Sequence, residues 1–467
     1  MDSLEDYRLQ IHEIDRQILT LIKNRLDIGI KVSEVKKTRD LPIIDANAET
    51  ATMDNLITTA ATLGVDGSLA KRLGTLLIGQ TIEVQNANIS KQSKDQLLKR
   101  IVELTQQMLL EGVHVTRFEI GEPNFPPPRQ VIRELSGSFR KSRIIGYGSA
   151  TGLPELRTKL AEELSNEHHV RIDPEQVLIT PGARFGIFAT VTSFVSELER
   201  VIIPQPAFPA YEECVSLRQG RTITVNSSLE DNWDLDLAKL EEELQKRPRM
   251  MILNSPNNPT GKIINKEKFH AIVELANKYG TLIVSDEVYD KYARSKVPSI
   301  LDEEYKNSVY INSFSKRFGL TGWRIAYLVT SIEYAKRIKR IVQTALTCVP
   351  EFIQKAALTG MKRGETDAKR NRRLILRKTE LTCRELDKID MEFFKPDGAF
   401  YLFPRSNKPN FNSVEFATKL LKEKHISVAP GLSFGDYPAF FRLAVSLPER
   451  QIPRAIKSIG EVVENWS

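Results

Sequence analysis

Apolar side chains recur with a period of seven at the start of the chain, in two neighbouring seams. The spacing puts both seams on one face of a helix, so it predicts one long amphipathic helix that Pro42 ends. Such a helix cannot bury its apolar stripe without partners. The seam positions are Leu4, Ile11, Ile18, Arg25 and Val32, and Tyr7, Ile14, Leu21, Ile28 and Val35.

Two more helices are predicted before the first polar stretch. One runs from about Ala46 to Leu63 and ends near Gly64, and the other runs from about Ser68 to Ile89. We therefore expect residues 1–90 to form an all-helical domain that a second copy of the chain completes. Residues 91–95 are polar and are expected to form a linker.

Beyond the linker, short apolar runs alternate with helical stretches, which predicts a mostly parallel seven-stranded sheet with helices on both faces. We assign this large domain to about 145–340, and a smaller α+β domain to about 96–144 and 341–467. The sheet strands are expected at Val177–Thr180, Val201–Ile203, Thr222–Val225, Met250–Leu253, Leu282–Ser285, Val309–Asn312 and Ile325–Val329. The smaller domain is expected to hold strands at Ala399–Phe403, Ile426–Ala429 and Phe441–Val445.

Composition narrows the class of protein. The 467 residues are 41% hydrophobic and 27% charged, which is ordinary for a water-soluble protein of several domains. The acidic opening predicts no signal peptide, and no apolar stretch is long enough for a membrane helix. Three scattered cysteines form neither a metal-binding spacing nor a disulfide framework, so we expect a cytoplasmic protein.

The net charge of +7 is a modest basic excess that could attract small anionic substrates. The densest basic run, residues 369–378, fits the solvated face of a long helix. No aromatic interleaving or recognition motif accompanies the charge, so we expect no nucleic-acid partner.

Polar residues follow three neighbouring strands of the predicted sheet. An amide-rich turn, residues 254–261, follows the first strand, Asp286 follows the second, and Lys316 and Arg324 follow the third. Alone, the acid could cap a helix and the turn could lie on the surface. Ligands of open α/β sheets bind at the carboxyl ends of strands, so the three together predict a ligand site.

The stretch Ser313-Phe314-Ser315-Lys316, followed by Gly322-Trp323-Arg324, resembles the fold-type I aminotransferases that use pyridoxal phosphate (PLP), of the aspartate, aromatic and prephenate group. The resemblance covers Gln96–Ser467. It implies that Lys316 carries the cofactor and moves the substrate proton, which requires a lysine of lowered pKa. It also implies that Asp286 keeps the pyridine nitrogen protonated.

The same resemblance assigns the rest of the site. Tyr289 and Asn258 would bond the phenolic oxygen of PLP, Phe208 would stack on its ring, and Arg442 would bind the substrate α-carboxylate. An amino acid would donate nitrogen and a 2-oxo acid would accept it; a decarboxylase or lyase on this fold is the alternative. The phosphate would meet Ser313, Ser315, Arg324, the backbone of Ala183 and Arg184, and Tyr147 of the partner chain, with Gly121 near the substrate.

Arg25 is unusual in an apolar seam, because a buried unpaired cation is costly. It either pairs with a carboxylate, or faces a cavity for an anionic ligand, or extends into solvent from an oligomerisation helix.

Residues 1–90 resemble the all-helical chorismate mutases, which work as intertwined dimers. The resemblance implies conversion of chorismate to prephenate by holding a compact conformer and stabilising charge on the ether oxygen. Arg25, with Arg8 from the partner chain, would bind two carboxylates, and Lys36 and Gln85 would bond the ether oxygen. Matching positions are Arg8, Arg25, Lys36, Asp45, Glu49, Thr81 and Gln85, with Glu49 and Asp45 at the ring hydroxyl.

One residue departs from that family, because Ala48 stands where several relatives carry arginine, and Thr81 replaces a serine. Our hypothesis is a bifunctional homodimeric enzyme of phenylalanine and tyrosine synthesis. The competing hypothesis is a general aspartate or alanine aminotransferase with a helical dimerisation or regulatory domain. The sequence does not assign the residues that recognise the substrate side chain. Candidates are Arg184, Arg317 and residues 126–129.

Overall fold

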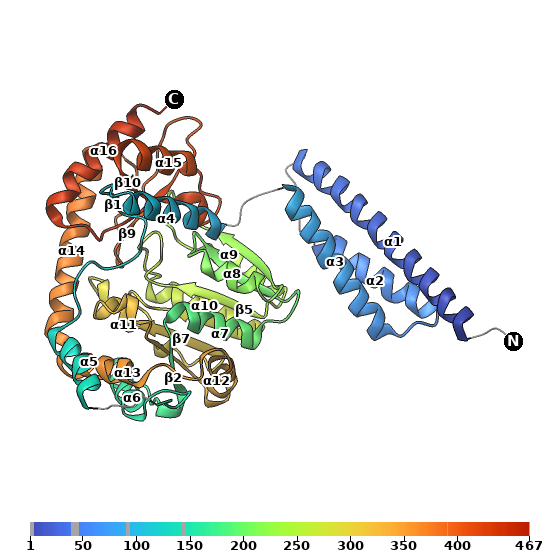
Figure 1. The fold of residues 1–467 in the computed structure, drawn as a ribbon, viewed down its shortest axis with the longest axis horizontal. Helices are drawn as coiled ribbons and strands as arrows, with labels where there is room; N and C mark the ends of the chain where they lie inside the picture. The colour runs from blue at the N-terminus through green and yellow to red at the C-terminus, as the bar shows by residue number, and fades with distance from the viewer. Residues whose placement is uncertain (1–3, 39–45, 90–93, 142–145, 390, 467) are drawn as a thin grey trace. The chain divides into compact units, whose positions relative to one another are not determined.

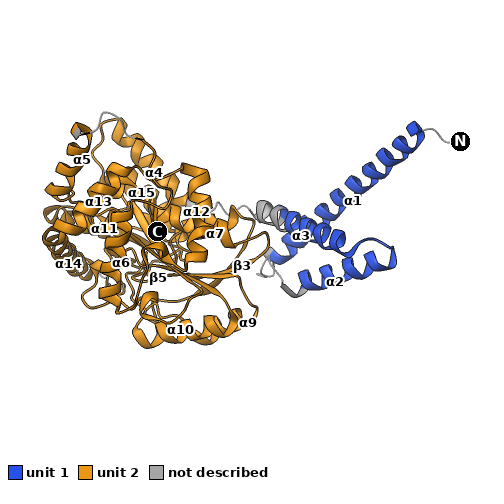
Figure 2. Cartoon of the chain, turned by 90° about the horizontal axis from the view of Figure 1, so that it is seen from below, with its two compact units in different colours: residues 1–92 blue, residues 93–467 orange. Residues whose placement is uncertain are grey.

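The structure is a computed structural model that describes residues 4–38, 46–89, 94–141, 146–389 and 391–466. It separates into two compact units, Met1–Gln92 and Ser93–Ser467 (Figure 2). None of the described helices is long and apolar enough to cross a bilayer.

The first unit consists of α1 (Leu4–Thr38), α2 (Ala46–Thr62) and α3 (Gly67–Ile89), which confirms the all-helical prediction (Figure 1). Helix α3 packs against both α1 and α2. The close contact with α1 depends on Gly29, because a Cβ there would lie 2.8 Å from Cγ2 of Thr81. Asp66 caps the start of α3 by accepting hydrogen bonds from the backbone N–H groups of Ser68 and Leu69.

Apart from Arg25, which contacts α3, the heptad seams of α1 lie mostly outside the face that α3 covers. Ile11, Leu21 and Ile28 are 56%, 67% and 60% exposed, whereas the buried positions on α1 are Gly29 and Ser33. The apolar stripe thus remains unburied within one chain, as expected of a helix that requires a partner.

The second unit contains the predicted seven-stranded sheet, in the order β2-β8-β7-β6-β5-β3-β4. Strand β8 is antiparallel to both of its neighbours, and the other neighbouring pairs are parallel. The strands are β2 (Val177–Thr180), β3 (Arg200–Gln205), β4 (Arg221–Asn226), β5 (Met250–Asn254), β6 (Leu282–Asp286), β7 (Ser308–Ser313) and β8 (Ala326–Thr330).

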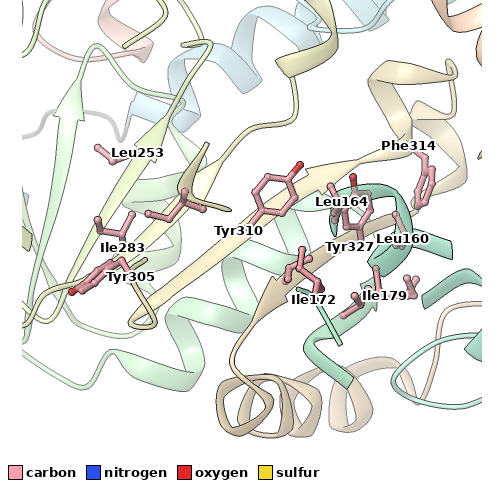
Figure 3. Close-up of a cluster of buried hydrophobic side chains, with 14 of the residues drawn as sticks. Leu160, Leu164, Ile172, Ile179, Leu253, Ile283, Tyr305, Tyr310, Phe314 and Tyr327 are labelled. Atoms are coloured by element: carbon pink, nitrogen blue, oxygen red, sulfur yellow. The ribbon is translucent and has the colours of Figure 1, made fainter. Parts of the chain in front are cut away.

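Helices bury both faces of this sheet. One apolar layer joins it to α7 (Ala183–Phe194), α8 (Ala210–Ser216) and α12 (Ile332–Leu346). The other layer includes Leu160 and Leu164, which cluster with Tyr310 and Tyr327 of the sheet (Figure 3). Helices of this second layer are α5 (Arg129–Lys141), α6 (Pro154–His168), α9 (Leu237–Gln245), α10 (Lys266–Tyr279) and α13 (Glu351–Arg363).

A second core holds the smaller α+β part, in which β1 pairs with β10, and β12 lies between β11 and β9. Its helices are α4 (Lys94–Leu110), α14 (Glu365–Asp387), α15 (Ser413–Lys424) and α16 (Ile452–Glu464). Its strands are β1 (Thr116–Arg117), β9 (Tyr401–Leu402), β10 (Ile426–Ser427), β11 (Ala429–Pro430) and β12 (Phe441–Ala444).

Two boundaries differ from our expectation. Helices α5 and α13, expected in the smaller domain, pack on the large sheet through Val131, Ala356 and Met361. Lys94 and Asp95, expected in the linker, belong to α4. An amphipathic pattern shows that a helix is covered, but it does not identify the core that covers it.

Candidate active site

A cavity of about 300 Å³ lies where the carboxyl ends of the sheet strands meet the smaller α+β part. Every aminotransferase position that we predicted lines it except Tyr147. It also contains residues that the sequence did not single out. These are Leu98, Val102, Glu119, Ile120, Glu122, Ile187, Tyr211, Val288, Thr321 and Tyr401.

Lys316 projects into this cavity from α11 (Phe314–Arg317), directly after β7. The Ser313 hydroxyl caps the helix by accepting from the Ser315 N–H at 3.0 Å. The Lys316 ammonium donates to the Gly121 carbonyl at 2.6 Å. Burial lowers its pKa to about 8 against the opposing charge of Glu122, so a neutral, nucleophilic amine is accessible near neutral pH.

Asp286, the last residue of β6, is 4% exposed. Burial raises its pKa to about 6, while the Tyr211 hydroxyl, which donates to Oδ2 at 2.6 Å, favours the anion. The carboxylate therefore remains largely ionised at neutral pH in a setting that favours a cationic partner. A protonated pyridine nitrogen is such a partner.

Another part of the cavity lining has the features of a phosphate site. Ser313, Ser315 and Arg324 line it beside the first turn of α7, whose N–H groups are suited to an anion. Gly182, before α7, has φ 94°, and a Cβ there would lie 2.1 Å from Nη2 of Arg324. Only glycine permits that approach. Partial burial and then the charge of Arg184 lower the Arg324 pKa.

Arg442 on β12 is 2% exposed and forms no ion pair within the described part of the chain. Its Nη1 donates to Asn258 Oδ1 at 3.0 Å, its Nη2 donates to the Glu119 carbonyl, and its buried Nε lacks a hydrogen-bond partner. A buried cation in this state is costly, and a carboxylate ligand would compensate the charge. Burial lowers its pKa.

Aromatic and amide groups surround the position between the lysine and the arginine. The Tyr289 hydroxyl lies 2.8 Å from the Tyr401 hydroxyl, and Asn254 Oδ1 accepts from the Asn258 N–H at 2.7 Å. The Phe208 ring also lines the cavity, with the guanidinium carbon of Arg184 at 5.0 Å from its centroid.

These groups fit PLP. The lysine can be neutral, the buried acid suits a protonated ring nitrogen, and the hydroxyls and glycine-permitted arginine suit a phosphate. When bound, PLP supplies an electron sink for negative charge at the substrate α-carbon.

Some predicted or candidate residues do not line this cavity. Tyr147 is 88% exposed and does not line the cavity of its own chain, so its role in a partner's site stays a prediction. Arg317 pairs with Glu163 and with Glu365, at 2.8 Å, and lines a different cavity from the one that holds Lys316. Residues 126–129 do not line the active-site cavity either.

In the helical unit, the side chain of Arg25 extends from α1 to α3. Its Nη1 donates to the Leu77 carbonyl at 2.7 Å and to the Thr81 hydroxyl, and burial lowers its pKa. Backbone and hydroxyl oxygens therefore orient this cation. Lys36 and Glu49 are half-buried. Asp45 and the side chain of Gln85 lie outside the described residues.

Arg8 is exposed on the same helix as Arg25. The two positions are 17 residues apart, or about 25 Å along the helix at 1.5 Å per residue. One compact ligand cannot reach both from a single chain.

Comparisons with known proteins agree with both family resemblances. Residues 113–459 match the family model for Aminotransferase class I and II, and residues 7–86 match Chorismate mutase type II. An aspartate aminotransferase from Sulfolobus acidocaldarius is 31% identical, covering 76% of this chain and 91% of the relative. A probable aspartate/prephenate aminotransferase from Aquifex aeolicus is also 31% identical, covering 77% and 93%.

The fold agrees as well. The crystal structure of an aspartate aminotransferase from Thermotoga maritima superposes with a TM-score of 0.75 at 29% identity, covering 79% of this chain and 97% of that chain. The chain therefore belongs to the class I and II aminotransferases, a PLP-dependent family, and carries a type II chorismate mutase segment before the aminotransferase domain.

Proposed function

We propose that this chain is a bifunctional enzyme of aromatic amino acid synthesis, which rearranges chorismate to prephenate and transaminates prephenate or a derived aromatic 2-oxo acid. The observation that carries the proposal is the presence of both family segments in one chain. The product of the first reaction is itself a 2-oxo acid, the class of compound that accepts nitrogen in the second. The name of the Aquifex aeolicus relative includes prephenate.

The cationic groups of the cavity favour a substrate with two carboxylates. Arg442 is suited to the α-carboxylate, and Arg184 is a second arginine on the same cavity. Prephenate carries one carboxylate on its oxo-acid side chain and another on its ring, whereas phenylpyruvate has only the first. Leu98, Val102 and Ile120 add an apolar wall that suits the ring.

In this proposal the side chains around Lys316 divide the work of transamination. Arg442 and Asn258 hold the α-carboxylate, which fixes the α-carbon next to the Lys316 amine. Lys316 removes and returns the α-proton, for which a pKa of about 8 is well suited. Asp286, oriented by Tyr211, keeps a proton on the ring nitrogen of the cofactor.

In the helical unit, catalysis needs only binding and charge stabilisation, because the rearrangement is pericyclic. Arg25 would bind one carboxylate, and Lys36 and Gln85 would stabilise the negative charge on the ether oxygen. Arg8 can join this site only from a second chain, and the exposed seam of α1 offers the apolar surface for it. We therefore propose a homodimer.

The substrate is tested by comparing prephenate with phenylpyruvate as the amino acceptor in the wild type and in Arg184→Gln. We expect Arg184→Gln to lower kcat/KM for prephenate about tenfold or more, through loss of one charge-assisted contact, and to leave phenylpyruvate almost unchanged. Arg129→Gln, which lies outside the cavity lining, is the control. Equal loss for both acceptors would contradict recognition of a second carboxylate.

The second candidate is an aspartate aminotransferase whose helical domain only supports dimerisation. Ala48, where several chorismate mutases carry arginine, favours it. This candidate predicts that chorismate persists in the presence of the pure protein while aspartate is transaminated. Restoration of mutase activity by Ala48→Arg would then identify the lost contact.

A further inference from the structure

We propose that Tyr401 is a positioning residue that couples the carboxylate-binding Arg442 to Tyr289 and through it to the bound cofactor. The inference rests on the proposed aminotransferase function. Tyr401 was not among the residues that the sequence singled out, and it follows from how three strand ends meet in the cavity.

The hydroxyl of Tyr401 lies at a crowded junction. It is 2.8 Å from the Tyr289 hydroxyl, and a Cβ on Gly121 would lie only 2.3 Å from it. Gly121 in turn accepts the hydrogen bond of Lys316. Tyr401 is 1% exposed, so its hydroxyl is removed from bulk water and needs a partner within the protein. That partner is the Tyr289 hydroxyl.

Arg442 covers the face of the Tyr401 ring, with its guanidinium carbon 4.7 Å from the centroid. Strand β12 pairs with β9 in the register Ala444↔Tyr401, and Arg442 lies two residues before Ala444 on β12. A cation at this distance withdraws electron density from the ring and makes its hydroxyl a stronger donor.

This charge decides the direction of the hydrogen bond. Each tyrosine hydroxyl has one proton, so only one of the pair can donate to the other. If Tyr401 donates, the proton of Tyr289 is available to the phenolic oxygen of the cofactor. A stronger donor there stabilises negative charge on that oxygen and lowers the pH at which the absorption of the bound cofactor changes.

Binding of a carboxylate to Arg442 would partly cancel its charge and weaken the donation by Tyr401. Binding of the α-carboxylate would thus raise the midpoint pH at which the absorption of the bound cofactor changes. Arg442 also donates to Asn258, which we propose bonds the same phenolic oxygen. Loss of the Tyr401 hydroxyl should therefore reduce the rise of the absorption midpoint on carboxylate binding without abolishing it. Other charged or titratable groups around the two tyrosines are Asp286 from β6, Tyr292 after β6, Lys316 from α11, Tyr211 from α8, and Glu119 and Glu122 after β1.

The test is the Tyr401→Phe substitution, which keeps the ring under Arg442 and removes only the hydroxyl. Tyr305→Phe is the matched control, because Tyr305 is a buried tyrosine whose hydroxyl donates to the Thr281 carbonyl in the large-domain core. The PLP-loaded proteins are titrated with acid and base while cofactor absorption is recorded, with and without 3-phenylpropionate, a carboxylate that cannot be transaminated. The dissociation constant of 3-phenylpropionate and the melting curve are measured on the same samples.

We expect Tyr401→Phe to raise the midpoint by about 0.5–1 pH unit, the equivalent of one hydrogen bond, and to reduce the further rise caused by 3-phenylpropionate. Tyr305→Phe should change neither value. Wild-type values of both the midpoint and the ligand-induced rise in Tyr401→Phe would overturn the inference.

A double variant distinguishes the proposed coupling from a midpoint shift that is caused only by disturbed packing. If Tyr401 acts through Tyr289, Tyr289→Phe/Tyr401→Phe should have the midpoint of Tyr289→Phe alone, whereas additive shifts would overturn the inference. Failure of the wild type to bind PLP at all would instead overturn the proposed function.

Discussion

The two units of this chain build their sites in opposite ways. In the aminotransferase unit, side chains from α4, β6, α11 and β12 enclose one cavity within a single chain, and Tyr147 is the one predicted residue that lies apart. In the helical unit, Arg8 and Arg25 share one helix and lie about 25 Å apart. A sheet-based core can collect distant segments around one cavity, whereas the site that we propose in the helical unit would be completed by a second copy of the chain.

The largest effect should separate the two units completely. Lys316→Ala removes the amine that we propose carries the cofactor and the α-proton, so transamination should fall at least about 1,000-fold while chorismate consumption stays within twofold. Borohydride reduction followed by mass spectrometry should find PLP fixed to Lys316 in the wild type and to no residue in the variant. Parallel loss of mutase activity would show that the units are not independent.

A somewhat smaller effect is expected for Arg442→Met, which leaves the β12 backbone intact but removes the carboxylate partner. Truncating one partner of a buried charge contact costs about 2–5 kcal/mol, so kcat/KM should fall roughly 30- to 5,000-fold. Cofactor content should stay near the wild-type value. Loss of PLP together with activity would mean that Arg442 supports the cofactor site and not substrate binding.

The same logic applies to the helical unit through Arg25→Ala, for which we expect chorismate mutase activity to fall about 100-fold, because one carboxylate loses its cation. Arg16→Ala is the control on the same helix, since the Arg16 side chain is 80% exposed. Transamination of phenylpyruvate should be unchanged in both variants. An equal effect of the two substitutions would contradict a ligand role for Arg25.

Substitutions in the apolar seam of α1 test whether two copies of the chain share the site in the helical unit. Ile18→Asp places a charge on the predicted seam, and Leu19→Asp places it on an adjacent position that is equally apolar and even more exposed, 67% against 48%. We expect Ile18→Asp to lower mutase activity about tenfold or more and to lower the melting temperature of the helical unit, because burial of a charge disrupts the partner contact. Leu19→Asp should have little effect; the reverse order would contradict the seam.

The smallest effect concerns a buried acid beside the cavity. Glu287 is 2% exposed, and burial raises its pKa to about 8 from 4.5. Because the folded protein binds this proton more tightly than the unfolded chain does, stability should decline as pH rises from about 4.5 to about 8. Glu287→Gln removes this decline, so its urea midpoint relative to wild type should improve from pH 5 to pH 8.5. A constant difference would contradict the raised pKa.

Local patterns were sufficient for much of the fold and the candidate site. The strands of the large sheet were predictable because their residues are buried on both faces, and the lysine, the acid and the amide follow directly from strand ends. Tyr211 and Tyr401 were missed because their contacts with Asp286 and Tyr289 span 75 and 112 residues. No periodicity reports such pairings, and the same limit misplaced α5 and α13.

The central claim is that both reactions act on the same carbon skeleton, and one measurement tests it most directly. Purified PLP-loaded protein is incubated with chorismate and ¹⁵N-labelled glutamate or aspartate, and the products are identified by mass spectrometry. We expect chorismate to disappear and the label to appear in an aromatic-pathway amino acid such as arogenate, phenylalanine or tyrosine. Chorismate that persists while the label passes readily to simple oxo acids would contradict the bifunctional assignment.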